Sequence, residues 1–87
     1  MHTPALSKPF FERIPLERFL AMSTDDLRGV LYELKTSRAR RESVLDDVAI
    51  ESLIRVMDRG GHRSVSALGP EAAKAWAARA GVYNPAT

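Results

Sequence analysis

The longest pattern of apolar residues runs from Ser43 to Gly61 and predicts a helix of unusual composition. On a helix that advances about 100° per residue, the apolar positions cover roughly two-thirds of the circumference, against ~100° for an ordinary surface helix. These positions are Leu45, Val48, Ala49, Ile50, Leu53, Ile54, Val56 and Met57. A helix this apolar needs neighbours on at least two sides, so we predict the central helix of a small all-α bundle.

Both ends of this predicted helix carry recognisable signals. Ser43 is placed to cap the first backbone amides, and Asp46 and Asp47 lie where the helix dipole favours negative charge. At the other end, Gly60 and Gly61 supply the left-handed residue that commonly ends a helix. We therefore expect the helix to begin directly after Ser43 and to end at the glycine pair.

A short helix and an extended arm are predicted at the N-terminal side. Pro15 suits the first position of a helix over 16–22, in which Leu16, Phe19 and Leu20 share one face. Residues 1–15 hold three prolines, which fix φ and remove backbone donors, so this segment is predicted to be an extended arm. We expect one domain over residues 1–87, with the bundle formed by 16–87.

A second main helix is predicted to begin at Ser23 or Thr24. Ser23 and Asp26 have the spacing of a capping box, with aspartate in the place of the usual glutamate. One apolar face follows, formed by Leu27, Val30, Leu31 and Leu34. This helix is predicted to pack that face on the central helix.

The last main helix is the easiest to delimit. Pro70 fits its first position and Gly81 its C-cap. Lys74 and Arg79 are expected away from its packed face. That face is predicted to contain Ala72, Ala73, Trp76, Ala77 and Ala80. The fold prediction is thus three main helices, a short N-terminal helix and the arm.

Four aromatic residues are candidates for binding a partner protein. They are Phe10, Phe11, Phe19 and Trp76. In one interpretation the phenylalanines fold back over the central helix; in the other they insert into a second protein or a second copy of the chain. Trp76 is the one large anchor of the last helix, and half-exposed tryptophans are frequent binding hot spots. Residue types alone leave both interpretations open.

Basic residues form the second group of candidates, for binding phosphates or an acidic protein surface. They are Lys35, Arg38, Arg40, Arg41, Arg59 and Arg63. Cations also suit the C-terminal ends of helices, so a purely structural interpretation stays open. In an up-down bundle the two clusters lie at opposite ends of the central helix, ~24 Å apart at 1.5 Å per residue, which argues against one compact patch.

Composition narrows the function classes. The chain of 87 residues has no cysteine, two histidines and a formal net charge of +2, so we expect no metal site and no thiol chemistry. No catalytic or nucleotide-binding motif is present, so we expect a non-enzymatic protein without a cofactor. The absence of a leader or a long apolar run predicts a cytoplasmic protein with no membrane span. The preference for arginine and alanine suggests a bacterial or phage gene.

Two functional hypotheses remain. The first is a small protein-interaction module: a regulator, inhibitor or adaptor that covers a surface on a partner or on a second copy of itself. It rests on the amount of apolar surface, which exceeds what short helices readily cover. The alternative is a nucleic-acid-binding protein whose arginine clusters contact phosphates with little sequence preference.

Overall fold

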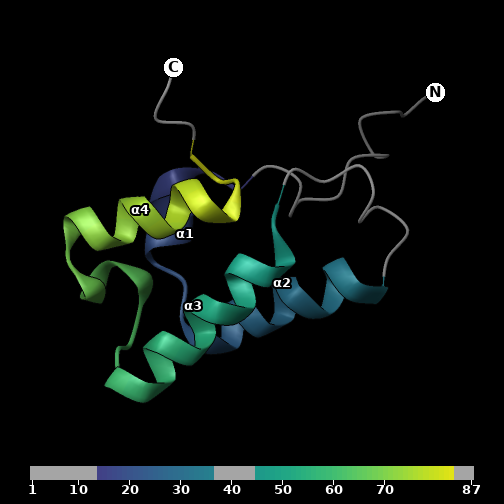
Figure 1. Ribbon diagram of the computed structural model, residues 1–87, viewed down its shortest axis with the longest axis horizontal. Coiled ribbons are helices and arrows are strands. Elements are labelled where there is room, and N and C mark those ends of the chain that lie inside the picture. Colours follow the sequence, from purple (N-terminus) through teal and green to yellow (C-terminus); the bar gives the residue numbers. More distant parts are fainter. Residues whose placement is uncertain (1–13, 37–44, 84–87) are drawn as a thin grey trace.

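The computed structural model describes residues 14–36 and 45–83, and these residues form an all-α fold (Figure 1). The elements in chain order are α1 (Leu16–Leu20), α2 (Thr24–Thr36), α3 (Asp47–Gly60), a 3-10 turn η4 (Val65–Leu68) and α4 (Pro70–Ala80). The predicted fold class is therefore confirmed, with α2, α3 and α4 as the main helices and α1 as the short one. The 3-10 turn was not predicted.

The central position of α3 is confirmed. It packs against α2 on one side and α4 on the other, while α1 contacts α4 and η4 (Figure 1). A single apolar cluster joins these elements. Its largest fully buried side chains are Phe19, Leu27, Leu34, Ile50, Leu53, Met57 and Val65. No polar or charged residue of the described ranges is buried, so hydrophobic burial is the main stabilising term.

The N-terminus of α2 has the predicted capping box. The Ser23 hydroxyl accepts a hydrogen bond from the Asp26 amide at 3.2 Å, and the Asp26 carboxylate accepts one from the Ser23 amide at 3.1 Å. Aspartate thus takes the role usually played by glutamate, and two amides without helical partners are satisfied reciprocally.

The predicted start of α3 is wrong by three residues. Asp46 is the N-cap, and its Oδ1 accepts hydrogen bonds from the amides of Val48 and Ala49 at 3.0 and 3.2 Å. The Asp46 amide itself bonds the carbonyl of Ala80 at 2.9 Å, which ties the start of α3 to the end of α4. Ser43, the predicted cap, lies outside the described residues. This tertiary bond holds Asp46 in the extended conformation that an N-cap requires.

Replacing Asp46 by alanine is expected to lower the free energy of unfolding by about 0.5–2 kcal/mol, because two amides lose their acceptor. Urea denaturation followed by circular dichroism measures the change. Asp46→Asn is the matched control, since an amide oxygen accepts the same bonds and should keep most of the stability. An Asp46→Ala protein as stable as the parent would show that this cap contributes nothing.

The C-terminus of α3 ends as predicted. Gly61 has φ of 69°, a left-handed conformation that costs a residue with a Cβ about 1 kcal/mol or more. The His62 amide bonds the Met57 carbonyl at 3.0 Å, which closes the helix end. The His62 ring lies close to Gly60. A Cβ atom at position 60 would stand 2.5 Å from Nε2 of that ring, so a side chain there would require the ring to move.

Two details of α1 differ from the prediction. Pro15 is the N-cap rather than the first helical residue, and its carbonyl accepts from the Phe19 amide at 3.0 Å. The helix ends at Leu20 rather than at 22. The next two backbone amides donate hydrogen bonds to carbonyls three residues earlier, whereas an α-helix requires a spacing of four residues. The carbonyl of Met22 instead accepts from the Val65 amide at 3.1 Å, linking this turn to η4.

The bounds of α4 are confirmed, with Pro70 at its first position and Gly81 as its left-handed C-cap. One detail of its packed face is wrong. Ala72 is exposed, and the buried alanines are Ala73, Ala77 and Ala80. Lys74 and Arg79 are exposed as predicted, and the guanidinium carbon of Arg79 lies 4.4 Å from the centre of the indole ring of Trp76.

Candidate interaction surface

The exposed large hydrophobic residues of the described chain all lie on α2 and α3. They are Tyr32, Val48 and Val56, with 69%, 67% and 41% of their surface exposed. Val48 and Val56 belong to the wide apolar arc predicted for α3, and both stay exposed. We call the outer surface of α2 and α3 that carries these three residues the hairpin surface.

A groove follows the line between the two helices. Arg28, near the start of α2, pairs with Asp58, near the end of α3, so the helices run antiparallel. Lys35, seven residues further along α2, therefore lies level with Glu51, seven residues back along α3. The groove is lined by Arg28, Leu31, Tyr32, Lys35, Glu51, Ile54, Arg55 and Asp58.

One end of the groove carries an exposed pair of opposite charges. Nη1 of Arg28 lies 3.4 Å from Oδ1 of Asp25, and its Nη2 contacts the carboxylate of Asp58. Of these three residues Arg28 and Asp58 line the groove, so this end of it is close to neutral, while Asp25 lines the hollow between α1 and α2. All three side chains are at least half exposed, so the pairs contribute little to stability but shape the local potential.

The other end of the groove is basic. Nη2 of Arg55 lies 3.6 Å from Oε2 of Glu51, an exposed pair four residues apart on α3. Lys35 adds a second cation, and no described residue forms an ion pair with it. Two cations and one carboxylate give this end a net charge of +1. The charge of the groove is therefore close to neutral at one end and positive at the other, and Tyr32 is also part of its lining.

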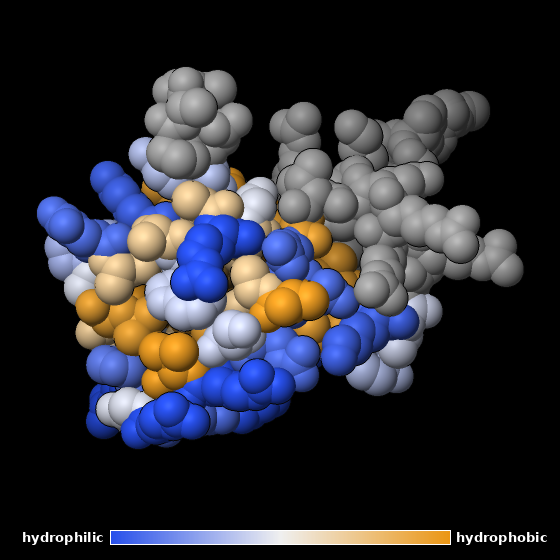
Figure 2. Space-filling model, in the orientation of Figure 1, coloured by the Kyte–Doolittle hydropathy of each residue, from blue (hydrophilic) through white to orange (hydrophobic). Residues whose placement is uncertain are grey.

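The solvent-facing side of α3 combines aliphatic and basic side chains. Val48, Ser52 and Val56 follow one another at intervals of four residues, and therefore share a side of the helix. A second hollow near the end of α3 is lined by Ser52, Arg55, Val56, Arg59 and Gly60. Figure 2 shows the resulting mixture, in which hydrophobic patches lie between hydrophilic side chains on the visible face.

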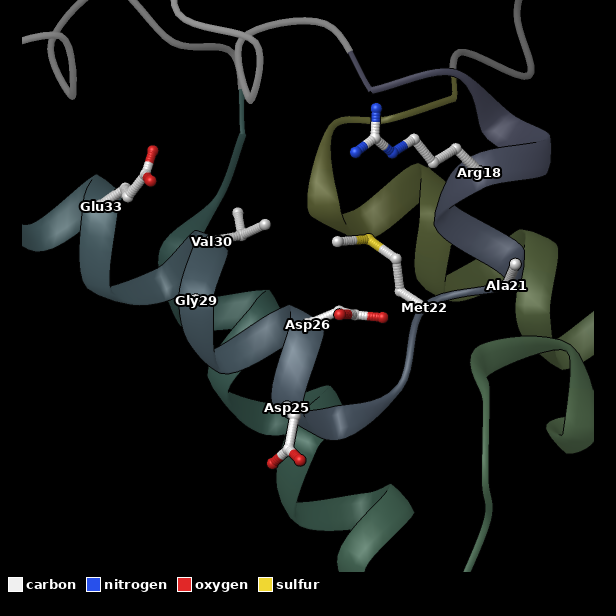
Figure 3. Close-up of a pocket in the computed structure, with 8 residues that line it drawn as sticks. All are labelled: Arg18, Ala21, Met22, Asp25, Asp26, Gly29, Val30 and Glu33. Carbon is white, nitrogen blue, oxygen red and sulfur yellow. The ribbon is translucent and has the colours of Figure 1, made fainter.

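A third hollow lies between α1 and α2 (Figure 3). Arg18 extends from α1, while three acidic side chains project from α2, and Met22 and Val30 lie between them. The acidic residues are Asp25, Asp26 and Glu33. They form no metal-binding group, because no cluster of three ligating side chains occurs within residues 14–36 and 45–83. The Asp26 carboxylate already accepts a hydrogen bond in the capping box, so helix capping accounts for one of these three acidic side chains.

The predicted aromatic candidates differ in how far the structure exposes them. Phe19 is completely buried in the core, so it covers the bundle and presents no surface to a partner; that part of the partner-binding prediction is corrected. Trp76 is half-buried and carries the Arg79 guanidinium on its ring, which leaves part of the indole accessible. Phe10 and Phe11 lie outside the described residues.

The predicted basic candidates do not form one patch among the described residues. Lys35 lies in the last turn of α2, whereas Arg59 lies in the last turn of α3. Because the helices are antiparallel, these two are at opposite ends of the hairpin, and Arg63 follows Arg59 beyond the helix end. All three are exposed. Arg38, Arg40 and Arg41 lie outside the described residues.

Tyr32 is the residue of the hairpin surface that sequence reasoning missed. Its signal was present, since Tyr32 lies on the polar side of α2, well away from the face formed by Leu27, Val30 and Leu34. An aromatic ring on the polar side of an amphipathic helix has no core to enter. Such a position is free to contact a partner protein.

No protein-family model, no curated protein and no solved structure significantly matches the chain. Among the helices of the described ranges, none has the length and hydropathy needed to cross a membrane.

Proposed function

We propose that this protein is a non-enzymatic interaction module that binds a protein partner through the hairpin surface. The observation that carries the proposal is the position of Tyr32, Val48 and Val56, the exposed large hydrophobic residues of the described chain, on α2 and α3. Exposed apolar side chains surrounded by charged ones are typical of protein-binding surfaces. The protein would act by covering a surface of the partner, as a regulator, inhibitor or adaptor.

The hairpin surface suits this role better than the other faces. Its backbone is held from both sides, by the Asp46 cap and its bond to Ala80 at one end and by the Gly61 turn at the other. A rigid helical pair loses little conformational entropy on binding. The charged side chains around Tyr32 are exposed, so they steer the encounter at little desolvation cost.

Site-specific crosslinking tests this proposal. A photoreactive amino acid placed at 32, 48 or 56 is expected to crosslink a defined protein from a lysate of the encoding cells. The same group at Lys74, exposed on α4, is the control and should give no comparable product. Capture that survives nuclease treatment supports a protein partner.

Charge placed on the surface provides the second test. The double variant Tyr32→Glu, Val48→Glu is expected to lower capture about tenfold or more, because two apolar contacts become buried carboxylates. Ala72→Glu, on the exposed side of α4, is the matched control and should bind normally. Capture that requires nucleic acid and collapses between about 50 and 200 mM salt would overturn the proposal in favour of phosphate binding by arginines.

A further inference from the structure

We propose that the outer face of α3 binds an acidic amphipathic helix of a partner protein. The inference rests on the proposed function, because it names the chemistry of the partner that the hairpin surface takes. It follows from three features of this face: a row of side chains that alternate in size, a hollow at the end of that row, and arginines along its edge.

The first feature is a row of side chains at every fourth position of α3, which lie along one ridge of the helix. The residues of this row are Val48, Ser52, Val56 and Gly60. The two valines are 67% and 41% exposed, whereas Ser52 is small and Gly60 has no side chain. Large and small positions therefore alternate over about 18 Å of helix. The side chains of a second helix fit such a row, because they enter the gaps at the small positions.

The second feature is the hollow near the end of α3. Ser52, Val56 and Gly60 line it together with Arg55 and Arg59. Ser52 and Gly60 are the small positions of the row, so the hollow coincides with the gaps that a second helix would fill. Val56 gives it an apolar part, and the two arginines give it a charged edge.

The third feature is the positive charge beside the row. Arg55 and Arg59 line the hollow, and no carboxylate of the described residues lines it with them. Arg55 lies 3.6 Å from Glu51, while Arg59 forms no ion pair with any residue of the described ranges. Two arginines and one glutamate leave a net charge of +1. Carboxylates of a partner are therefore attracted to this edge, and Arg59 is available to pair with one of them.

The backbone of α3 selects a helical partner over an extended one. The N–H and C=O groups within a helix bond one another, so an extended segment cannot add to α3 as it adds to the edge of a sheet. A segment that is buried on this face has to satisfy its own backbone hydrogen bonds, which a helix does. Its apolar side chains then meet the valine row, and carboxylates beside them meet the arginines.

Fluorescence anisotropy of a labelled probe peptide, titrated with the purified full chain, tests the inference. The probe is a designed amphipathic helix of roughly 20 residues with leucine on one face and glutamate beside it. A matched probe carries lysine at every glutamate position, and the two residues have similar helix propensities. The glutamate probe is expected to bind, more weakly as salt rises, and the lysine probe about tenfold more weakly or not at all.

Two further probes test the shape of the partner. A glutamate probe with proline at its centre cannot form a continuous helix, and one with serine in place of leucine has no apolar face. Each is expected to bind about tenfold more weakly than the parent probe or worse. A single-stranded oligonucleotide of the same net charge is the comparison for phosphate binding, and it should not displace the glutamate probe.

Charge reversal in the chain gives the decisive result. The double variant Arg55→Glu, Arg59→Glu is expected to reverse the preference, so that the lysine probe binds it more tightly than the glutamate probe. The double variant Lys74→Glu, Arg79→Glu makes the same change of charge on the exposed side of α4 and should keep the preference of the parent. Circular dichroism of each variant establishes that the helices are retained.

Four results would overturn the acidic helix. They are a glutamate probe that binds no better than the lysine probe, a proline probe that binds as well as the helical one, a charge reversal that leaves the preference unchanged, and displacement by the oligonucleotide. A chain that fails these tests but still crosslinks another protein from 32, 48 or 56 keeps the proposed function and loses only the acidic helix. A chain that fails them and gives no crosslinks loses both.

Discussion

Replacing Phe19 by alanine is expected to lower the free energy of unfolding by about 3–5 kcal/mol. The ring is completely buried, and it anchors α1, a helix of five residues that contacts α4 and η4. Removing it loses the transfer energy of the ring and leaves a cavity that so short a helix does not readily fill. For a domain of this size the melting temperature should fall by about 15 °C or more.

Thermal and urea denaturation measure this loss, and Tyr32→Ala is the matched control. Tyr32 is also an aromatic residue on a helix, but it is 69% exposed, so its removal should change stability by about 0.5 kcal/mol or less. The two variants therefore separate a core role from a surface role. A Phe19→Ala protein with the stability of the parent would return Phe19 to the list of partner-binding residues.

The local signals in the sequence were sufficient for most helix boundaries. Ser23 with Asp26, Pro70, Gly61 and Gly81 all act as predicted, because capping depends on residues within one turn of the helix end. These positions need no knowledge of the rest of the fold. Boundaries of this kind can be read from a single sequence.

The start of α3 shows where local reasoning stops. Ser43 and Asp46 both have side chains that cap helices, and both precede the apolar run. What selects Asp46 is the bond from its amide to Ala80, which lies 34 residues further along the chain. The same limit applies to α4: the exposure of Ala72 depends on which side α3 approaches, and its own sequence does not contain that information.

The candidate surface was predictable in kind but not in position. The width of the apolar arc on α3 indicated more apolar surface than one neighbour covers, and Val48 and Val56 are the exposed remainder. Which positions stay exposed depends on the directions from which α2 and α4 pack. The groove beside Tyr32 depends on the antiparallel register set at Arg28 and Asp58, a contact across 30 residues.

Replacing Leu53 by alanine is expected to cost about 2–5 kcal/mol. Leu53 is completely buried near the middle of α3, the helix that contacts both α2 and α4. Its loss leaves a cavity in the core, and α3 is not free to move into it because the Asp46 amide ties this helix to the carbonyl of Ala80. Denaturant unfolding should show a lower midpoint with an unchanged slope.

Two variants set the scale for this measurement. Val48 lies five residues earlier on the same helix with 67% of its surface exposed, so Val48→Ala should change stability by about 0.5 kcal/mol or less. Leu53→Met keeps the volume of the side chain and should cost less than about 1.5 kcal/mol. If Leu53→Ala proved as mild as Val48→Ala, α3 would not be the helix around which the bundle packs, and the hairpin surface would lose its rigid support.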